Sequence, residues 1–363
     1  VARNLGITPE QRPWLFVVKK NKTVLERLYR WIKNHVANAH DAATGRKIVT
    51  HLPLLLIDDE ADHASVDTGE QVFDADGRPD EEHQPTAINS RIRKILHSFA
   101  RSAYVGYTAT PFANIFVDPD TDDEMLGHDL FPRHFIISLD PPSNYFGARQ
   151  VFLDDEGQTA VRRIGDHEAT LPLSHKISTV IGDLPPSLVT ALRAFILSRA
   201  IRLSREHDSP HCSMLVNVSR FTNIQTQVRN LIHERLDRIQ SSVRVHGARP
   251  SAEALRDPEI AGLHEVWQRE YQEVSPDWEA VKEQLHAAAA PIRVVEVNST
   301  SAGTLNYAEH PDGLNVVAVG GFALSRGLTL EGLSISYFLR NSRMYDTLMQ
   351  MARWFGYRPG YED

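Results

Sequence analysis

Short apolar runs alternate with longer amphipathic stretches along most of the chain, and this alternation is typical of strands joined by helices. The clearest run is LPLLLIDDEAD, from Leu52 to Asp62, and YVGYTATPF follows at 104–112. An apolar run bounded by Pro53 and acidic residues predicts a strand that is buried on both faces of a parallel sheet. The pattern therefore favours an α/β fold.

The same pattern predicts the other elements. Strands are expected at 15–18, 103–107, 135–139, 214–218, 292–298, 316–319 and 333–339, and helices at 24–37, 87–100, 188–203, 224–238, 276–289 and 344–355. These elements divide into a first lobe over 1–140, a linker or small appended element over 141–186, and a second lobe over 187–363. A helical insertion is expected at about 240–290, and its tryptophans, Trp267 and Trp278, are expected to pack together rather than to stack on bases.

Two carboxylates stand at the predicted carboxyl end of a strand, where open α/β sheets bind ligands. Mg²⁺ prefers oxygen ligands and keeps several waters, so Asp59 can hold the metal beside a phosphate while Glu60 polarises the attacking water. Acidic residues also end strands as caps of a following helix, and this alternative would explain an isolated pair. Here the pair belongs to the tetrapeptide DEAD, which continues to Asp62.

A second predicted strand supplies hydroxyl groups at a comparable sheet edge. Thr108 and Thr110 follow the run 103–107. Their hydroxyls can hydrogen-bond Asp59 or Asp62 and sense the release of phosphate. Alternatively, they are turn residues before Pro111, which disfavours helix at the residue that precedes it.

Arginines near the end of the chain are candidates for a contact with the γ-phosphate. Arg353 and Arg358 follow Gln350 on a stretch with helical spacing. An arginine from a neighbouring lobe stabilises the charge that develops in phosphoryl transfer. An arginine on an amphipathic helix is otherwise a solvated or salt-bridged residue.

With these motifs the sequence resembles superfamily 2 helicases and translocases, and within them the Z1-domain family of bacterial restriction and phage-defence proteins. The matching stretches are IDDEADHAS, YVGYTATPFANIF, DLFPRHFIISLDPPSNYFGA, GGFALSRGLTLEGL and QMARWFGYRPGY. The DEAD and TAT elements are common to the superfamily, whereas the other stretches are more specific to the family. The resemblance implies two RecA-like lobes, each a parallel sheet flanked by helices, which hydrolyse ATP with Mg²⁺ between them and act on DNA.

The resemblance also implies a role for each motif residue. Asp59 and Glu60 take the Walker B roles, Asp62 completes the motif, Thr108 and Thr110 couple hydrolysis to movement, Arg326 and Gly327 belong to the fifth motif, and Gln350, Arg353 and Arg358 belong to the sixth. The usual glycine–arginine spacing of the sixth motif is not reproduced, so the choice of the arginine finger stays open.

No G-x-x-x-x-G-K-[ST] phosphate loop occurs in the sequence. The nearest stretch, VVKKNKT at 17–23, lacks glycine, so its side chains would keep the backbone N–H groups away from phosphates. In the resembled family the loop lies upstream of such a segment, and Val1 is not a start methionine. We therefore expect an internal part of a longer protein, which binds ATP poorly by itself.

The composition is that of a globular protein with two cores: 363 residues, 42% hydrophobic and 24% charged. The single cysteine, Cys212, excludes an intrachain disulfide, favours the cytoplasm, and is expected to be a buried thiol. The sequence shows neither a long apolar run nor a signal pattern, so no membrane partner is expected.

The net charge of −8 argues mildly against a general nucleic-acid binder, but the charge is distributed unevenly. Residues 1–50 contain ten Lys and Arg against three Asp and Glu, whereas residues 58–82 contain eleven acids and one arginine. The acidic stretch after Asp62 is expected to form a mobile loop.

Candidate contacts with a DNA backbone lie in both halves of the chain. Lys19, Lys20 and Lys22 follow the first predicted strand, although a solvated basic helix face explains them equally well. Arg220 and Thr222 follow the strand expected at 214–218, where a second lobe commonly grips nucleic acid. The expected partner is double-stranded DNA, together with restriction or defence proteins.

Three classes of function remain open. The first is an ATPase motor on DNA. The second is an endonuclease, whose catalytic centre would lie in another domain because the sequence contains no carboxylate pair with E-x-K spacing and no histidine-based metal cluster. The third is a non-catalytic scaffold that binds DNA or a partner protein.

Overall fold

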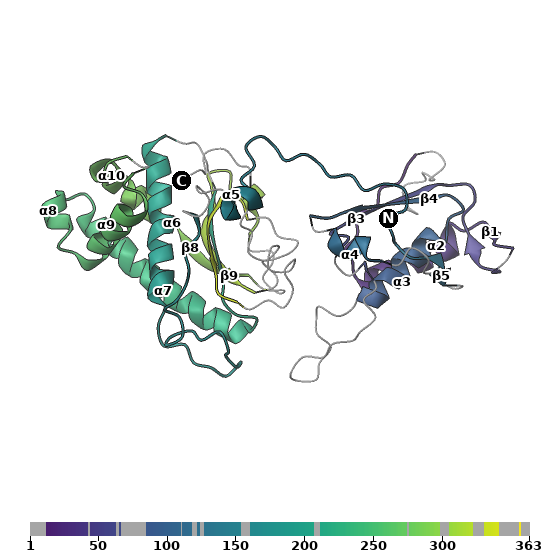
Figure 1. Ribbon diagram of the computed structural model, residues 1–363, viewed down its shortest axis with the longest axis horizontal. Helices are drawn as coiled ribbons and strands as arrows, with labels where there is room; N and C mark the ends of the chain where they lie inside the picture. The colour runs from purple at the N-terminus through teal and green to yellow at the C-terminus, as the bar shows by residue number, and fades with distance from the viewer. Residues whose placement is uncertain are drawn as a thin grey trace. The chain divides into compact units, whose positions relative to one another are not determined.

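The chain forms two compact units, residues Val1–Leu139 and Asp140–Asp363, which we call unit 1 and unit 2 (Figure 1). A computed structural model describes residues 12–42, 44–62, 65–66, 85–109, 111–117, 122–123, 127–153, 160–206, 211–273, 276–297, 305–321, 330–340 and 356. Both units combine helices with parallel strands, so the predicted α/β class is confirmed.

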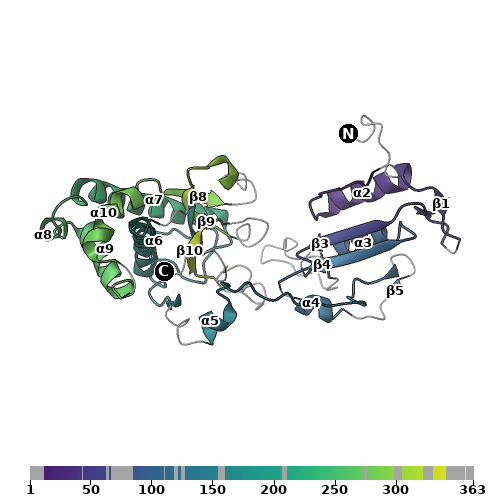
Figure 2. The ribbon, with the colours of Figure 1, turned by 90° about the horizontal axis from the view of Figure 1, so that it is seen from above.

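Unit 1 is built around two parallel strands. Its elements are α2 (Lys22–His35), β1 (Ala39–His40), β2 (Lys47–Ile48), β3 (Leu54–Asp59), α3 (Pro85–Leu96), β4 (Ser102–Tyr107), α4 (Phe112–Ile115), β5 (Asp122–Asp123) and β6 (Gly127–His128). Strands β3 and β4 are paired in register from Leu54 and Ser102 to Asp59 and Tyr107, so their carboxyl ends lie side by side (Figure 2). Asn21 caps the start of helix α2, because its side chain accepts a hydrogen bond from the Val24 N–H.

Only one face of the β3–β4 pair is covered within the described part of unit 1. Leu54, Leu56 and Tyr104 pack with residues of α2 and α3 in one core. Leu55 and Ile57 point the other way, and each is 61% exposed. The prediction that this strand is buried on both faces is therefore wrong for these residues, because the helices of unit 1 pack against only one side of it (Figure 1).

Two predicted strands of unit 1 are absent. Residues 15–18 and 135–139 are described, but neither stretch has strand conformation, and Leu15 and Leu139 are 88% and 79% exposed. A β-branched run becomes a strand only where a neighbouring strand pairs with its backbone. Neither stretch has such a neighbour among the strands that the structure describes.

Unit 2 contains a larger parallel sheet. Its elements are α5 (Ala148–Phe152), α6 (Pro186–Ser204), β7 (Cys212–Asn217), α7 (Thr222–His246), α8 (Ser251–Ala254), α9 (Pro258–Glu270), α10 (Trp278–Ala289), β8 (Arg293–Val297), η3 (Tyr307–Glu309), β9 (Asn315–Gly320) and β10 (Leu333–Phe338). The four described strands are all parallel and lie in the order β10-β7-β9-β8. Helix α7 continues past its predicted end because Ile239 and Val243 extend its buried stripe.

Both faces of the unit 2 sheet are buried. Met214 and Val317 face a core that includes residues of α6, α7, α9 and α10, and α6, α7 and α10 lie on one side of the sheet in Figure 1. Leu215 and Val316 face the opposite way and pack with Tyr307 in a second core. The strands that supply these core residues are rich in β-branched side chains, which is typical of a parallel sheet covered on both faces.

The helical insertion packs as the sequence predicts. Trp267 of α9 and Trp278 of α10 are 8% and 7% exposed, and their ring centroids are 5.8 Å apart. Cys212 is also buried, and burial raises the pKa of its thiol. The predictions of packed tryptophans and of a buried thiol are confirmed.

Within unit 2, the segment 160–184 is held to the helices by polar contacts. Arg162 pairs with Glu270 of α9 at 2.6 Å, and Asp166 accepts hydrogen bonds from the backbone N–H and the hydroxyl of Ser187 on the first turn of α6. His175 Nε2 lies 2.7 Å from the Ser219 hydroxyl.

The helix predicted at 344–355 lies outside the described residues. So does most of the acidic loop predicted after Asp62, of which the structure describes residues 65–66. In the parts of the chain that the structure does describe, no helix is long and apolar enough to cross a membrane.

Candidate functional site

The DEAD turn, residues 59–62, lies at the carboxyl end of the β3–β4 pair. Asp59 is the last residue of β3 and is paired in register with Tyr107, the last residue of β4. The Ala61 N–H then donates to the Tyr107 carbonyl at 2.9 Å, which docks the turn on the end of β4. The turn therefore stands where parallel sheets present side chains to ligands.

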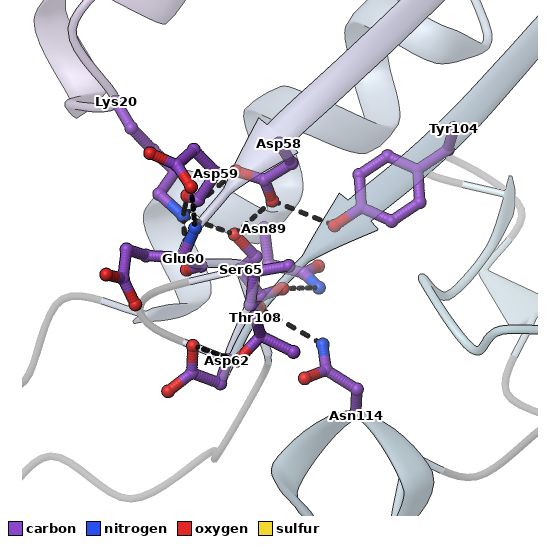
Figure 3. Close-up of polar contacts among 11 residues, drawn as sticks. Lys20, Asp58, Asp59, Glu60, Asp62, Ser65, Asn89, Tyr104, Thr108 and Asn114 are labelled. Carbon is purple, nitrogen blue, oxygen red and sulfur yellow. Dashed lines mark hydrogen bonds and ion pairs between the residues drawn. The ribbon is translucent and has the colours of Figure 1, made fainter. Parts of the chain in front are cut away.

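Glu60 adopts a left-handed backbone conformation, with a φ of 53°. This region is disfavoured for residues other than glycine because the Cβ approaches the backbone. The Glu60 side chain extends away from the end of the Lys20 side chain in Figure 3. Asp59 is exposed, and its Oδ1 accepts a hydrogen bond from the Glu60 N–H at 3.1 Å.

The two strand ends are joined by a side-chain hydrogen bond. The Thr108 hydroxyl donates to Asp62 Oδ1 at 2.7 Å (Figure 3). The sequence predicted a hydrogen bond from a threonine hydroxyl to Asp59 or Asp62, and this contact realises it for Asp62. Asn114 of α4 adds a second link, because its amide donates to the Ala61 carbonyl at 3.1 Å.

Lys20 contacts the backbone of the same turn. Its Nζ lies 2.9 Å from Asp58 Oδ1 and donates to the carbonyls of Asp59 and Glu60 at 2.8 and 2.6 Å. A fourth contact, at 3.2 Å, is made to the Ser65 hydroxyl. The Lys20 side chain is only 21% exposed, so its ammonium serves contacts within the protein.

Asp58 is the buried carboxylate of the site. Its side chain is 4% exposed and accepts hydrogen bonds from the Ser65 and Tyr104 hydroxyls at 2.5 and 2.8 Å. Burial and the nearby charge of Asp58 raise the pKa of the Tyr104 phenol, which stays protonated and donates. A buried carboxylate needs such partners, and here the lysine and two hydroxyls provide them.

The polar network continues into α3. The Asn89 amide donates to the Ser65 carbonyl at 2.7 Å and to Asp129 Oδ1 at 2.8 Å. Asn89 is 1% exposed, so these hydrogen bonds form inside the unit. The network fixes the residues that follow the DEAD turn to the helix that covers the sheet.

The remaining predicted site residues are separated from this network or lie outside the described residues. Lys19 and Lys22 are exposed. In unit 2, Arg220 and Thr222 are exposed at the carboxyl end of β7, and the Arg220 guanidinium lies over the Phe221 ring at 4.8 Å. Thr110, Arg326, Gly327, Gln350, Arg353 and Arg358 lie outside the described residues.

Sequence reasoning missed Asp58, Ser65 and Tyr104. It assigned Lys20 to a contact with the DNA backbone or to a solvated helix face, whereas the Lys20 ammonium is bonded to Asp58 and to the DEAD turn. A signal for Asp58 was present, because Leu54, Leu56 and Asp58 share one face of a strand and an acid in that register enters the core. No comparable signal identifies Lys20, because its partners come from a strand far along the chain.

The carboxylates can support binding of a divalent cation. Asp59 is exposed, while Glu60 and Asp62 are partly buried, so acidic oxygens are presented at the end of the sheet. Among the described residues no three His, Cys, Asp or Glu side chains converge on a metal position. Magnesium beside a nucleotide does not require such a cluster, since one carboxylate, waters and phosphate oxygens complete its shell.

Residues 187–363 match the family model of the Z1 domain. This match lies within unit 2, and residues 1–186, which include the DEAD turn, are outside it. No curated protein and no solved structure is similar enough to the chain to count as a match.

Proposed function

We propose that this chain forms the two RecA-like lobes of an ATP-driven motor that acts on DNA in bacterial restriction or phage defence. One observation carries the proposal. Asp59, Glu60 and Asp62 lie at the carboxyl end of a parallel strand pair, and the hydroxyl of the residue directly after the neighbouring strand, Thr108, donates to Asp62 at 2.7 Å. The Z1 domain match over residues 187–363 supports the choice of protein class.

In the proposed reaction Asp59 would hold Mg²⁺, which would neutralise negative charge on the nucleotide phosphates. Glu60 accepts a hydrogen bond from the attacking water and orients it. Both residues lie at the same end of the β3–β4 pair, an arrangement that would bring the water and the phosphate next to each other.

The hydrogen bond between Thr108 and Asp62 is the proposed coupling element. Because it joins the ends of β3 and β4, a change at the carboxylates on phosphate release moves the segment after β4. The family resemblance implies that Thr110 takes part in the same coupling, that Arg326, Gly327 and Gln350 bind the nucleotide, and that Arg353 or Arg358 stabilises the developing charge. All six residues lie outside the described part of the chain.

DNA is the proposed polymeric partner. The exposed Lys19, Lys22 and Arg220 supply positive charge for phosphates, and the exposed Thr222 supplies a hydroxyl at the first turn of α7. Contacts of this kind bind the DNA backbone without reading its sequence, which suits a protein that moves along a duplex.

Replacement of the proposed catalytic carboxylate tests the function. Glu60→Gln in the full-length protein should lower DNA-stimulated ATP turnover roughly 100-fold or more, because the amide cannot act as a base. Nucleotide binding should persist. Glu253→Gln is the matched control, because Glu253 is an exposed glutamate on α8. Undiminished turnover in Glu60→Gln contradicts the proposal.

The two alternative functions give different results in the same protein. Magnesium-dependent nicking of a plasmid by this chain alone would identify a nuclease. DNA binding without any ATP turnover in the full-length protein would identify a scaffold.

A further inference from the structure

We propose that Lys20 is a positioning residue of the DEAD turn, which holds Glu60 in the conformation that its catalytic role requires. The catalytic part of this inference rests on the proposed ATPase function. The structural part concerns only the described residues of unit 1 and can be tested separately.

One ammonium group controls both backbone dihedrals of Glu60. The Asp59 carbonyl belongs to the peptide plane before Glu60, and the Glu60 carbonyl belongs to the plane after it. Lys20 Nζ binds the first oxygen at 2.8 Å and the second at 2.6 Å (Figure 3). With both planes tied to the same nitrogen atom, φ and ψ of Glu60 cannot change without the loss of a hydrogen bond.

The conformation held in this way is unfavourable on its own. A φ of 53° brings the Cβ of a glutamate close to its own backbone and is less stable than a right-handed conformation. Hydrogen bonds from a charged donor are stronger than those between neutral groups. The two carbonyl contacts of Lys20 therefore offset the cost of the left-handed turn.

Asp58 makes the Lys20 position stable. The Lys20 ammonium is neutralised at 2.9 Å by the Asp58 carboxylate, which is itself almost completely buried and receives two hydroxyl hydrogen bonds. If Lys20 turned to a DNA phosphate, Asp58 would remain buried without its counter-charge, which is strongly unfavourable. Lys20 thus differs from Lys19 and Lys22, whose side chains are exposed.

We expect Lys20→Met to loosen the turn, whereas Lys47→Met should not. Both replacements remove one ammonium from unit 1, and Lys47 is exposed on β2 and belongs to neither the DEAD turn nor the proposed DNA contacts, so Lys47→Met is the matched control. Hydrogen exchange of the Ala61 amide, which donates to the Tyr107 carbonyl, should become roughly tenfold faster in Lys20→Met. ATP turnover in the full-length protein should fall roughly tenfold or more, with little change in the KM for ATP.

Two further variants separate positioning from a general loss of folding. Lys20→Arg keeps a charge for Asp58, but its planar fork cannot hold the two carbonyls from one atom, so it should fold and still show faster exchange at Ala61. Adding Glu60→Gly to Lys20→Met should restore slow exchange, because glycine adopts a left-handed conformation without strain.

Unchanged exchange at Ala61 in both Lys20 variants would overturn the inference. So would a Lys20→Met protein that loses only DNA affinity and keeps its turnover, because Lys20 would then be a DNA contact. Absence of ATP turnover in the wild-type full-length protein refutes the proposed function and with it the catalytic part, whereas the exchange results still decide whether Lys20 holds the turn.

Discussion

A single missing methyl group allows the DEAD turn to dock on β4. A Cβ placed on Gly106 would lie 2.8 Å from the Ala61 Cβ, which is closer than two carbon atoms can approach. Both atoms are attached directly to backbone, so no flexible side chain can move aside. The glycine of YVGYTAT thus lets the turn after β3 lie against the neighbouring strand.

Gly106→Ala should therefore destabilise unit 1 by about 1–3 kcal/mol, the usual cost of overpacking. Gly165→Ala is the control, because a Cβ there meets nothing within 4 Å. Thermal unfolding of both variants measures the difference. A Gly106→Ala protein as stable as Gly165→Ala would show that the turn can shift away from β4 without cost.

The adjacent acidic residues at the end of β3 have different environments, because the side chains of a strand point alternately to its two faces. Asp58 shares the inward face of β3 with Leu54 and Leu56 and is buried, whereas Asp59 is exposed at the end of the sheet. The run of acids thus divides into one structural carboxylate, Asp58, and the proposed metal ligand, Asp59.

At the scale of elements, α9 is connected to the segment 160–184 through Glu270. Both of its carboxylate oxygens are bonded: Arg162 donates to Oε2 at 2.6 Å, and Arg269 donates to Oε1 at 2.8 Å. Burial raises the pKa of Glu270, but these hydrogen bonds and charges outweigh it, and the net pKa is lowered.

A lowered carboxyl pKa in the folded protein means that the Glu270 contacts stabilise unit 2 above the unfolded pKa of about 4.3 and are lost as the pH falls through the folded value. Glu270→Gln should therefore lower the stability by at most about 1 kcal/mol at pH 7, since both arginines are largely exposed. The difference should shrink as the pH falls below the unfolded pKa and through the lowered folded pKa. Melting temperatures of both proteins between pH 7 and pH 3 test this, and a pH-independent difference would contradict it.

At the scale of the whole molecule, each unit has its own hydrophobic core. Phe195 of α6 is fully buried in unit 2, and Ile92 of α3 is 2% exposed in unit 1. A unit with its own core can unfold in a separate cooperative step.

Calorimetry of the chain should accordingly resolve two transitions. Phe195→Ala should lower the free energy of unfolding of unit 2 by about 3–5 kcal/mol and leave the transition of unit 1 unchanged. Ile92→Ala should lower that of unit 1 by about 2–5 kcal/mol and leave the transition of unit 2 unchanged. A single transition that moves with both variants would show that the two units unfold as one.

The local hydrophobic pattern was sufficient to predict most of the helices and strands, because the residues that form one buried stripe or run are close together in the sequence. The elements found where periodicity placed them are the helices α2, α3, α6, α7 and α10 and the strands β3, β4, β7, β8, β9 and β10. The position of the carboxylates at a strand end followed from the same pattern.

Contacts between distant residues decided the rest. The runs 15–18 and 135–139 are not strands, because β-structure needs a partner that the run itself does not specify. The contact of Lys20 with the DEAD turn joins residues about forty positions apart, and only the folded chain brings them within hydrogen-bonding distance. Periodicity is a local property, whereas strand pairing and buried ion pairs depend on the path of the chain in space.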